Sequence, residues 1–249
     1  MKTAILEGRR VTKKFGGLIA SKQIDFEIQE GEIFGLIGPN GAGKTTLLNL
    51  INGIIPMTSG EIVFCGQRIN RLKPYKITRL GIARVFQIAR TFEDLTVKEN
   101  VLVGQLFGKK KSKNISRGMK EAQAILDFVG LGEKRNHRTS EITLADRKRM
   151  EIARALTMAP KLLLLDEVMA GLNPREVKDM MEMILTVNKK GITILLIEHV
   201  MKAIMGISTR VMVLHDGKRI ALGTPKEISE NAEVVRVYLG ERFSIEWSL

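Results

Sequence analysis

Residues 38–45 read Gly-Pro-Asn-Gly-Ala-Gly-Lys-Thr, and this stretch decides the fold. Its spacing satisfies G-x-x-x-x-G-K-[ST], the pattern of a loop whose backbone amides surround phosphate oxygens. The stretch follows a short apolar run, 33–37. It precedes a segment of helical pattern that extends to about Asn52 and is closed by Gly53. A strand, a glycine-rich loop and a helix in this order predict a phosphate-binding loop in an α/β domain.

The residue types of this loop suit a nucleotide. Glycines let the backbone turn tightly, so that several N–H groups converge on one anion, and the positive end of the next helix points at the same place. Lys44 adds a charge for the β- and γ-phosphates, and Thr45 offers a hydroxyl to Mg²⁺. A glycine-rich turn that matches by chance would not explain the flanking strand and helix. The predicted nucleotide-binding residues are Gly38, Pro39, Asn40, Gly41, Ala42, Gly43, Lys44, Thr45 and Thr46.

A second signal is the apolar run 162–165, which is followed directly by Asp166 and Glu167. Such a strand carries two carboxylates to its C-terminal end, where α/β sheets place their ligands. We expect Asp166 to hold Mg²⁺ through water and Glu167 to act as the general base on the attacking water. Many buried strands end in acids, so this reading depends on its pairing with the phosphate-binding loop.

A third apolar run, 194–197, leads into Glu198 and His199. A neutral imidazole at that strand end could hydrogen-bond a γ-phosphate and so report its presence. A lone histidine is more often structural or simply exposed, and from the residues alone both readings stay open.

The remaining pattern predicts the architecture around these motifs. Segment 22–29 alternates polar and apolar residues like a half-exposed antiparallel strand, and 61–65 reads as another strand. Asn173, Pro174 and Glu176 predict a capped helix start, with Gly191 as its stop. Asp216-Gly217 predicts a hairpin between 211–215 and 219–222.

The middle of the chain, from about 88 to 149, is helical in pattern, most clearly at 97–107 and 119–129. We expect a single domain of 1–249, with a nucleotide-binding core and β subdomain in 1–87 and 150–249. The smaller helical subdomain would be 88–149. Strands that alternate with helices in the core predict a parallel sheet.

The order of these motifs, 38–46, then 162–167, then His199, resembles that of ABC ATPases, a class of P-loop NTPases. The resemblance implies a parallel sheet core, an antiparallel β subdomain and a helical subdomain. It also implies that Gln87 touches Mg²⁺ and that the segment after it, 88–100, contacts membrane subunits. Phe15 matches the aromatic residue that stacks on adenine, although it could otherwise be plain core, and 170–173 matches the loop that crosses the dimer interface.

The match covers nearly the whole chain and is closest to the ATPase subunits of branched-chain amino-acid uptake transporters. The tail 234–240, Val-Val-Arg-Val-Tyr-Leu-Gly, supports that subgroup. The resemblance implies ATP hydrolysis that energises import of a small solute. It further implies transmembrane permease subunits, a dimer with an identical or homologous ATPase, an external solute-binding protein, and a place on the cytoplasmic face of the membrane.

Two positions depart from the family pattern. The L-S-G-G-Q signature, which would contact the opposite subunit's ATP, falls on Ile142 followed by Thr143, Leu144, Ala145 and Asp146. Thr143 and Asp146 can form a capping box that preserves a helix N-terminus. Since an acid near phosphate is unfavourable, we expect Asp146 to point away or to pair with Arg147 or Lys148. Val168 replaces the usual proline after the catalytic glutamate, which we expect to be tolerated.

Composition bounds the other readings. The chain has 249 residues, one cysteine (Cys65) and a net charge of +13. No run reaches the roughly 18 apolar residues of a membrane span, and the three histidines lack metal-ligand spacing. The charge fits nucleic-acid binding, an anionic membrane face or simple solubility.

The charge therefore invites an alternative class, a nucleic-acid-associated ABC ATPase. Against it, the chain has no long heptad insertion and only one copy of each motif, and its basic cluster at 109–120 lacks interleaved aromatics. We expect no nucleic-acid partner. A P-loop kinase or GTPase would leave Gln87 and the Thr143 segment unexplained, and the guanine-specific Asn-Lys-x-Asp is missing.

Overall fold

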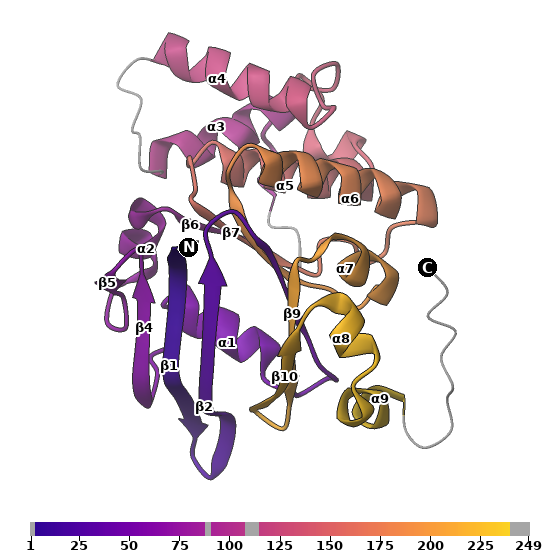
Figure 1. Ribbon diagram of the computed structural model, residues 1–249. Coiled ribbons are helices and arrows are strands. Elements are labelled where there is room, and N and C mark those ends of the chain that lie inside the picture. The colour runs from indigo at the N-terminus through magenta and orange to yellow at the C-terminus, as the bar shows by residue number, and fades with distance from the viewer. Residues whose placement is uncertain (1–2, 88–90, 108–114, 240–249) are drawn as a thin grey trace. The chain divides into compact units, whose positions relative to one another are not determined.

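The computed structural model describes residues 3–87, 91–107 and 115–239 (Figure 1). Contacts divide the chain into two units. The first comprises Met1–Pro74 and Thr193–Leu249, and the second comprises Tyr75–Ile192. The functional division into a core and an 88–149 helical subdomain stays a prediction. Within the described residues, no helix has the length and apolar character needed to cross a membrane.

The first unit contains an antiparallel sheet of the order β2-β1-β4-β5. Its strands are β1 (Ala4–Phe15), β2 (Leu18–Gln29), β4 (Ser59–Phe64) and β5 (Gln67–Arg68), and β1, β2 and β4 run side by side in Figure 1. Ile24, Phe26 and Ile28 are buried on one face of β2, which confirms the predicted alternation. Strand β4 ends one residue before Cys65, because Cys65 and Gly66 both have positive φ and form the turn into β5.

The same unit contains four strands in the order β10-β9-β3-β8. They are β3 (Ile33–Ile37), β8 (Thr193–Ile197), β9 (Arg210–His215) and β10 (Lys218–Gly223). Strand β3 is central, parallel to both neighbours, and all five of its residues are buried. Asp216 (φ 47°) and Gly217 (φ 73°) make the predicted hairpin turn. The helices of this unit are α1 (Lys44–Ile51), α7 (Met201–Ile207), α8 (Pro225–Ser229) and α9 (Ala232–Leu239).

The second unit contains two parallel strands, β6 (Ile82–Val85) and β7 (Leu162–Asp166). Its helices are α2 (Pro74–Leu80), α3 (Val97–Phe107), α4 (Ile115–Phe128), the 3-10 turn Thr139–Glu141, α5 (Leu144–Leu156) and α6 (Pro174–Lys189). Helix α3 has the predicted bounds, whereas α4 begins earlier than the predicted 119. Asn173 caps α6 as predicted and Gly191 follows its end with φ 87°.

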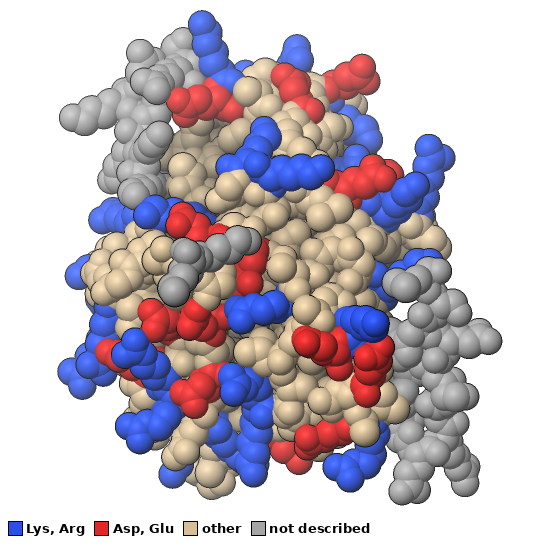
Figure 2. Space-filling view, in the orientation of Figure 1, with Lys and Arg blue, Asp and Glu red and all other residues tan. Residues whose placement is uncertain are grey.

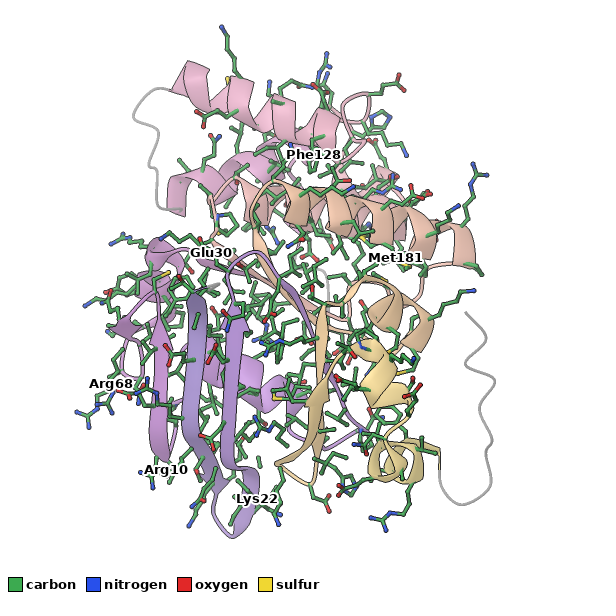
Figure 3. The ribbon with its side chains drawn as sticks, in the orientation of Figure 1. Arg10, Lys22, Glu30, Arg68, Phe128 and Met181 are labelled. Carbon is green, nitrogen blue, oxygen red and sulfur yellow. The ribbon has the colours of Figure 1, made fainter. Side chains whose placement is uncertain are left out.

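Helices α3, α4 and α5 pack on one another around an apolar core. That core consists of Val97, Val101, Ala122, Leu126, Val129, Leu131, Ile142, Met150 and Ala153. Phe128 ends α4 (Figure 3), and the Lys190 ammonium lies 3.7 Å from its ring centroid. The core fixes α5, whose N-terminus carries the signature residues.

Candidate active site

The phosphate-binding loop joins β3 to α1 in the first unit. Gly41 and Gly43 have φ of 81° and 102°, in the region that favours glycine. Gly43 is the N-cap of α1 and offers no side chain to the amides of the first turn. A Cβ at Gly43 would lie 2.4 Å from the Ala20 carbonyl oxygen, so β2 leaves room only for glycine. The result is a helix N-terminus whose amides and dipole suit an anion.

Lys44 is the buried cation of this loop. Its side chain is folded over the loop, where Nζ donates to the carbonyl oxygens of Gly38 (2.6 Å) and Pro39 (3.1 Å). A buried ammonium needs such acceptors, and phosphate oxygens are stronger ones. Thr45 is exposed on the first turn of α1, and Thr46 is half-buried beside it. The loop thus holds one positive charge and one accessible hydroxyl close to the helix N-terminus.

Strand register brings the predicted His199 to the edge from which the loop departs. Strands β3 and β8 are parallel neighbours that pair Leu36 with Ile197, so Gly38 and His199 both follow the same ends of adjacent strands. His199 is exposed, whereas the preceding Glu198 is buried. Phe15 ends β1 with 47% of its surface exposed, and the Lys13 ammonium lies 4.7 Å from its ring centroid. An exposed ring of this kind can stack on a base.

In the second unit, a buried ion pair fixes the first predicted acid. Arg84 Nη2 lies 2.7 Å from Asp166 Oδ2, and the two side chains are 3% and 5% exposed. A buried carboxylate is tolerated only with such a partner. Sequence reasoning missed Arg84, although an arginine inside the apolar stretch 82–85 is a signal, since a cation on a buried strand requires an acid.

Glu167, the predicted base, lies directly after β7 with a left-handed backbone (φ 52°). Gln87 Nε2 donates a hydrogen bond to Glu167 Oε2, so two of the predicted site residues are in contact. Lys148 Nζ in turn donates to the Gln87 carbonyl oxygen (2.6 Å) and ties residue 87 to α5. Val168 is fully buried, so the apolar side chain that replaces proline is accommodated.

The signature segment forms the N-terminus of α5 with the predicted capping box. Thr143 Oγ1 accepts from the Asp146 amide (3.2 Å) and donates to Asp146 Oδ2 (2.9 Å). Ala145 is buried and Leu144 is 45% exposed. A Cβ at Gly171 would lie 3.1 Å from Leu144 Cδ2, so the 170–173 loop packs beside the signature.

The expected partner of Asp146 is corrected. Lys134, not Arg147 or Lys148, pairs with it at 2.6 Å, because the N3 carboxylate turns back toward the cap, which Lys134 reaches. Arg147 instead donates to the Thr139 carbonyl oxygen and Lys148 to that of Gln87. Burial alone would raise the pKa of Asp146, but the Lys134 ammonium and the Thr143 hydroxyl and amide outweigh it and lower the pKa. The acid is therefore ionised and locally neutralised.

Other predicted features lie wholly or partly outside the described residues. They are most of the basic cluster, from Lys109 to Lys113, the start of the 88–100 segment, and Gly240 at the end of the tail.

Comparisons with known proteins agree with this geometry. A family profile described as "ABC transporter" matches residues 21–170, and one described as "Branched-chain amino acid ATP-binding cassette transporter" matches 218–244. The branched-chain amino acid transport ATP-binding protein LivG of Salmonella typhimurium is 42% identical, over 97% of this chain and 100% of its own. BraF of Pseudomonas aeruginosa, with the same description, is 38% identical over the same shares.

Solved structures give the same result. An ATP-binding cassette of an ABC transporter, in its ADP conformation, is 30% identical with a TM-score of 0.88, covering 96% of this chain and 100% of that one. A dimeric bacterial ABC transporter cassette is 27% identical with a TM-score of 0.79, covering 88% of this chain and 98% of that one.

Proposed function

Because this chain belongs to the family of ABC transporter ATP-binding proteins and is an ATPase of that class, we propose that it energises the import of branched-chain or other hydrophobic amino acids. The relatives LivG and BraF are described as branched-chain amino acid transport proteins, and this supports the substrate class. The observation that carries the nucleotide-binding role is the β3–α1 loop, where a buried lysine lies beside a helix N-terminus that glycine leaves uncapped. Solute selectivity would lie in permease subunits and an external solute-binding protein.

Oxygen ligands for Mg²⁺ would come from Thr45, Gln87 and Asp166. A hydroxyl, an amide oxygen and a carboxylate are the hard donors that this ion prefers, and Gln87 uses its nitrogen, not its oxygen, toward Glu167. Mg²⁺ is usually bound through one or two protein side chains together with substrate phosphates, so the ion would be held jointly with the nucleotide. The ion would neutralise charge on the β- and γ-phosphates.

We assign the hydrolytic step to residues of the second unit. Glu167 accepts a proton from water as the water oxygen attacks the γ-phosphorus, and ADP leaves with the β–γ bridging oxygen. The Gln87 amide holds the Glu167 carboxylate by its hydrogen bond. His199 would sense the γ-phosphate at the ends of β3 and β8.

We place the N-terminus of α5 against the ATP of a second cassette, in a dimer with an identical or homologous ATPase. The neutralised Asp146 keeps that terminus able to accept an anion, because Lys134 and Thr143 satisfy the carboxylate. Pairing with a homologous ATPase would set this chain's bound ATP against the partner's signature. Permease subunits would hold both cassettes at the cytoplasmic face of the membrane.

The test is Glu167→Ala in the transporter assembled with the membrane proteins that co-purify with the chain. We expect ATP hydrolysis and amino-acid uptake to be lost while ATP binding is kept. General-base catalysis contributes roughly 10²- to 10⁴-fold, so the rate of ATP hydrolysis should fall by at least about 10²-fold. Glu182→Ala, an exposed acid on α6, is the matched control and should keep full turnover. Uptake at the normal rate by the Glu167 variant would exclude this residue as the base.

The alternative, a nucleic-acid-associated ATPase, draws its support from the net charge of +13. On the face that Figure 2 displays, Lys and Arg side chains are interspersed with Asp and Glu rather than gathered into one basic band. On this face, the distribution favours a solvated surface over a nucleic-acid groove. The discriminating measurement is ATPase activity with and without added DNA or RNA, and stimulation by either would favour the alternative.

A further inference from the structure

A tyrosine near the end of the described chain contacts the phosphate-binding loop. The Gly38 N–H donates to the Tyr238 hydroxyl oxygen at 2.6 Å, across 200 residues of sequence and within the first unit. Gly38 is the first residue of the loop and is buried, so its amide needs an acceptor. Helix α9, which carries Tyr238, lies in none of the motifs that bind or hydrolyse nucleotide.

Gly38 is held from several sides. A Cβ at this position would lie 2.3 Å from the Leu214 carbonyl oxygen and 2.9 Å from Ala42 Cβ. The Gly38 carbonyl oxygen accepts a hydrogen bond from the Lys44 ammonium (2.6 Å). One peptide residue therefore links the Tyr238 phenol on its amide side to the nucleotide-binding lysine on its carbonyl side.

The support behind Tyr238 is firm. Asn231 Oδ1 caps α9 by accepting from the amides of Glu233 (3.0 Å) and Val234 (3.1 Å), and Val234 is buried. Helix α9 packs on α8 and β10, and Thr224 and Glu227 close a capping box at the start of α8. A hydroxyl on such a helix has a fixed position, so its hydrogen bond can fix the position of Gly38.

The chemistry of the phenol suits a site for a polyanion. Burial raises the pKa of Tyr238 to about 12, against the smaller opposing effect of the Gly38 amide. The hydroxyl is therefore neutral across the physiological range and brings no negative charge toward phosphates. It accepts one hydrogen bond and keeps its own proton.

We propose that Tyr238 is a positioning residue for ATP binding, which holds Gly38 so that the loop presents Lys44 and its amides to the phosphates. Helix α9 thereby sets the affinity of the loop for nucleotide. This inference rests on the nucleotide-binding role proposed for residues 38–46. It predicts that loss of the Tyr238 hydroxyl weakens the binding of nucleotides that carry β- and γ-phosphates, since the loop is proposed to contact those groups.

The chain offers a matched control, because it has only two tyrosines. Tyr75 is 51% exposed on α2, so Tyr75→Phe removes the same atom from a site without that contact. In Tyr238→Phe the buried Gly38 amide loses its acceptor. The free energy of one lost hydrogen bond corresponds to a rise in the Kd for ATP of roughly 3- to 10-fold. Titration calorimetry on the full chain should show this rise for Tyr238→Phe alone, with AMP affinity unchanged in both variants.

A second measurement separates positioning from a purely structural role and keeps the Tyr238 hydroxyl, because it adds only a fluorine atom to the ring. With 3-fluorotyrosine incorporated, the chain gives two ¹⁹F resonances, which Tyr75→Phe assigns. Because the pKa of Tyr238 is raised to about 12, its fluorinated phenol stays protonated at neutral pH. ATP should shift the Tyr238 resonance and leave that of Tyr75 in place.

Each outcome bears on one claim. Equal ATP affinity in Tyr238→Phe and Tyr75→Phe, or a Tyr238 resonance that ignores saturating ATP, overturns the positioning role. If the unaltered chain binds no ATP at all, the proposed function fails instead. Should Tyr238→Phe not fold, the ¹⁹F measurement on the otherwise unaltered chain still decides.

Discussion

Replacing Gly43 with alanine should weaken ATP binding by an amount that the loop geometry bounds. Gly43 has φ 102°, and a non-glycine residue in such a region costs about 1–3 kcal/mol. The new Cβ would also lie 2.4 Å from the Ala20 carbonyl oxygen, whereas real Cβ contacts stay above 3.0 Å. The loop or β2 must then move by at least 0.6 Å (3.0 − 2.4).

If the loop relieves this strain by leaving its binding conformation, the strain energy appears in the Kd. One to three kcal/mol corresponds to roughly 5- to 150-fold weaker ATP binding at 25 °C. Titration calorimetry with Mg-ATP measures the change directly. Thermal unfolding in the same buffer reports whether the strain is also felt by the fold.

Two other glycines separate backbone strain from steric overlap. Gly66 has φ 75° and open space where a Cβ would be, in the turn between β4 and β5. Gly66→Ala should lower the melting temperature without changing the Kd for ATP. Gly41 has φ 81° and open space where a Cβ would be, so the Kd of Gly41→Ala for ATP should lie between those of Gly43→Ala and Gly66→Ala. An ATP affinity of Gly43→Ala within twofold of the unaltered chain would refute the reasoning.

Two further predictions concern the start of α5. Thr143→Ala removes the N-cap hydroxyl and should lower the free energy of unfolding by about 1 kcal/mol, which is a fall in melting temperature of about 2–4 °C. Thr143→Ser keeps the hydroxyl and should largely avoid this loss. An unchanged melting temperature in calorimetry would contradict the capping role. Lys134→Met removes the ammonium that helps to lower the pKa of Asp146. The charged Asp146 stabilises the fold fully above the unfolded pKa of about 3.9, and this stabilisation is lost as pH falls through the lower folded pKa. Because Lys134 is 45% exposed, we expect Lys134→Met to lower the free energy of unfolding by about 0.2–1 kcal/mol at pH 7. This difference should shrink as pH falls below about 3.9, vanish once pH is below the folded pKa of Asp146, and be absent in Lys134→Arg. Urea unfolding at several pH values measures it, and an equal loss at all pH values would contradict the pairing.

Features set by local chemistry were predictable from the sequence. The phosphate-binding loop, the Asn173 cap of α6 and the Asp216-Gly217 turn each depend on a few adjacent residues whose conformations are restricted. The alternation of buried and exposed side chains along β2 was equally predictable. These elements follow from their own residues without knowledge of what packs against them.

Two strands, β1 and β6, were not predicted from the sequence. Strand β1 was missed because its register shifts between Gly8 and Val11, where Arg10 has φ 47°, and this breaks the two-residue period. Strand β6 carries a buried arginine, which hides its apolar character. In both strands the structure depends on partners that lie far away in the sequence.

The same limit applies to the candidate site. Gln87 and Glu167 were each predicted, but their contact spans 80 residues and no spacing rule encodes it. The pairs Arg84–Asp166 and Lys134–Asp146, and the bond from Gly38 to Tyr238, are likewise tertiary. The roles assigned to the site residues stay predictions until the variants are measured.

The left-handed backbone at Glu167 sets activity and robustness against each other at one position. A glutamate there bears a conformational cost that glycine or asparagine would relieve. Selection for thermal stability alone would then favour variants in which Glu167 is replaced by a residue without a carboxylate. A more stable variant with a substitution at residue 167 is expected to have lost ATP hydrolysis, so stability screens of this protein should measure hydrolysis together with the melting temperature.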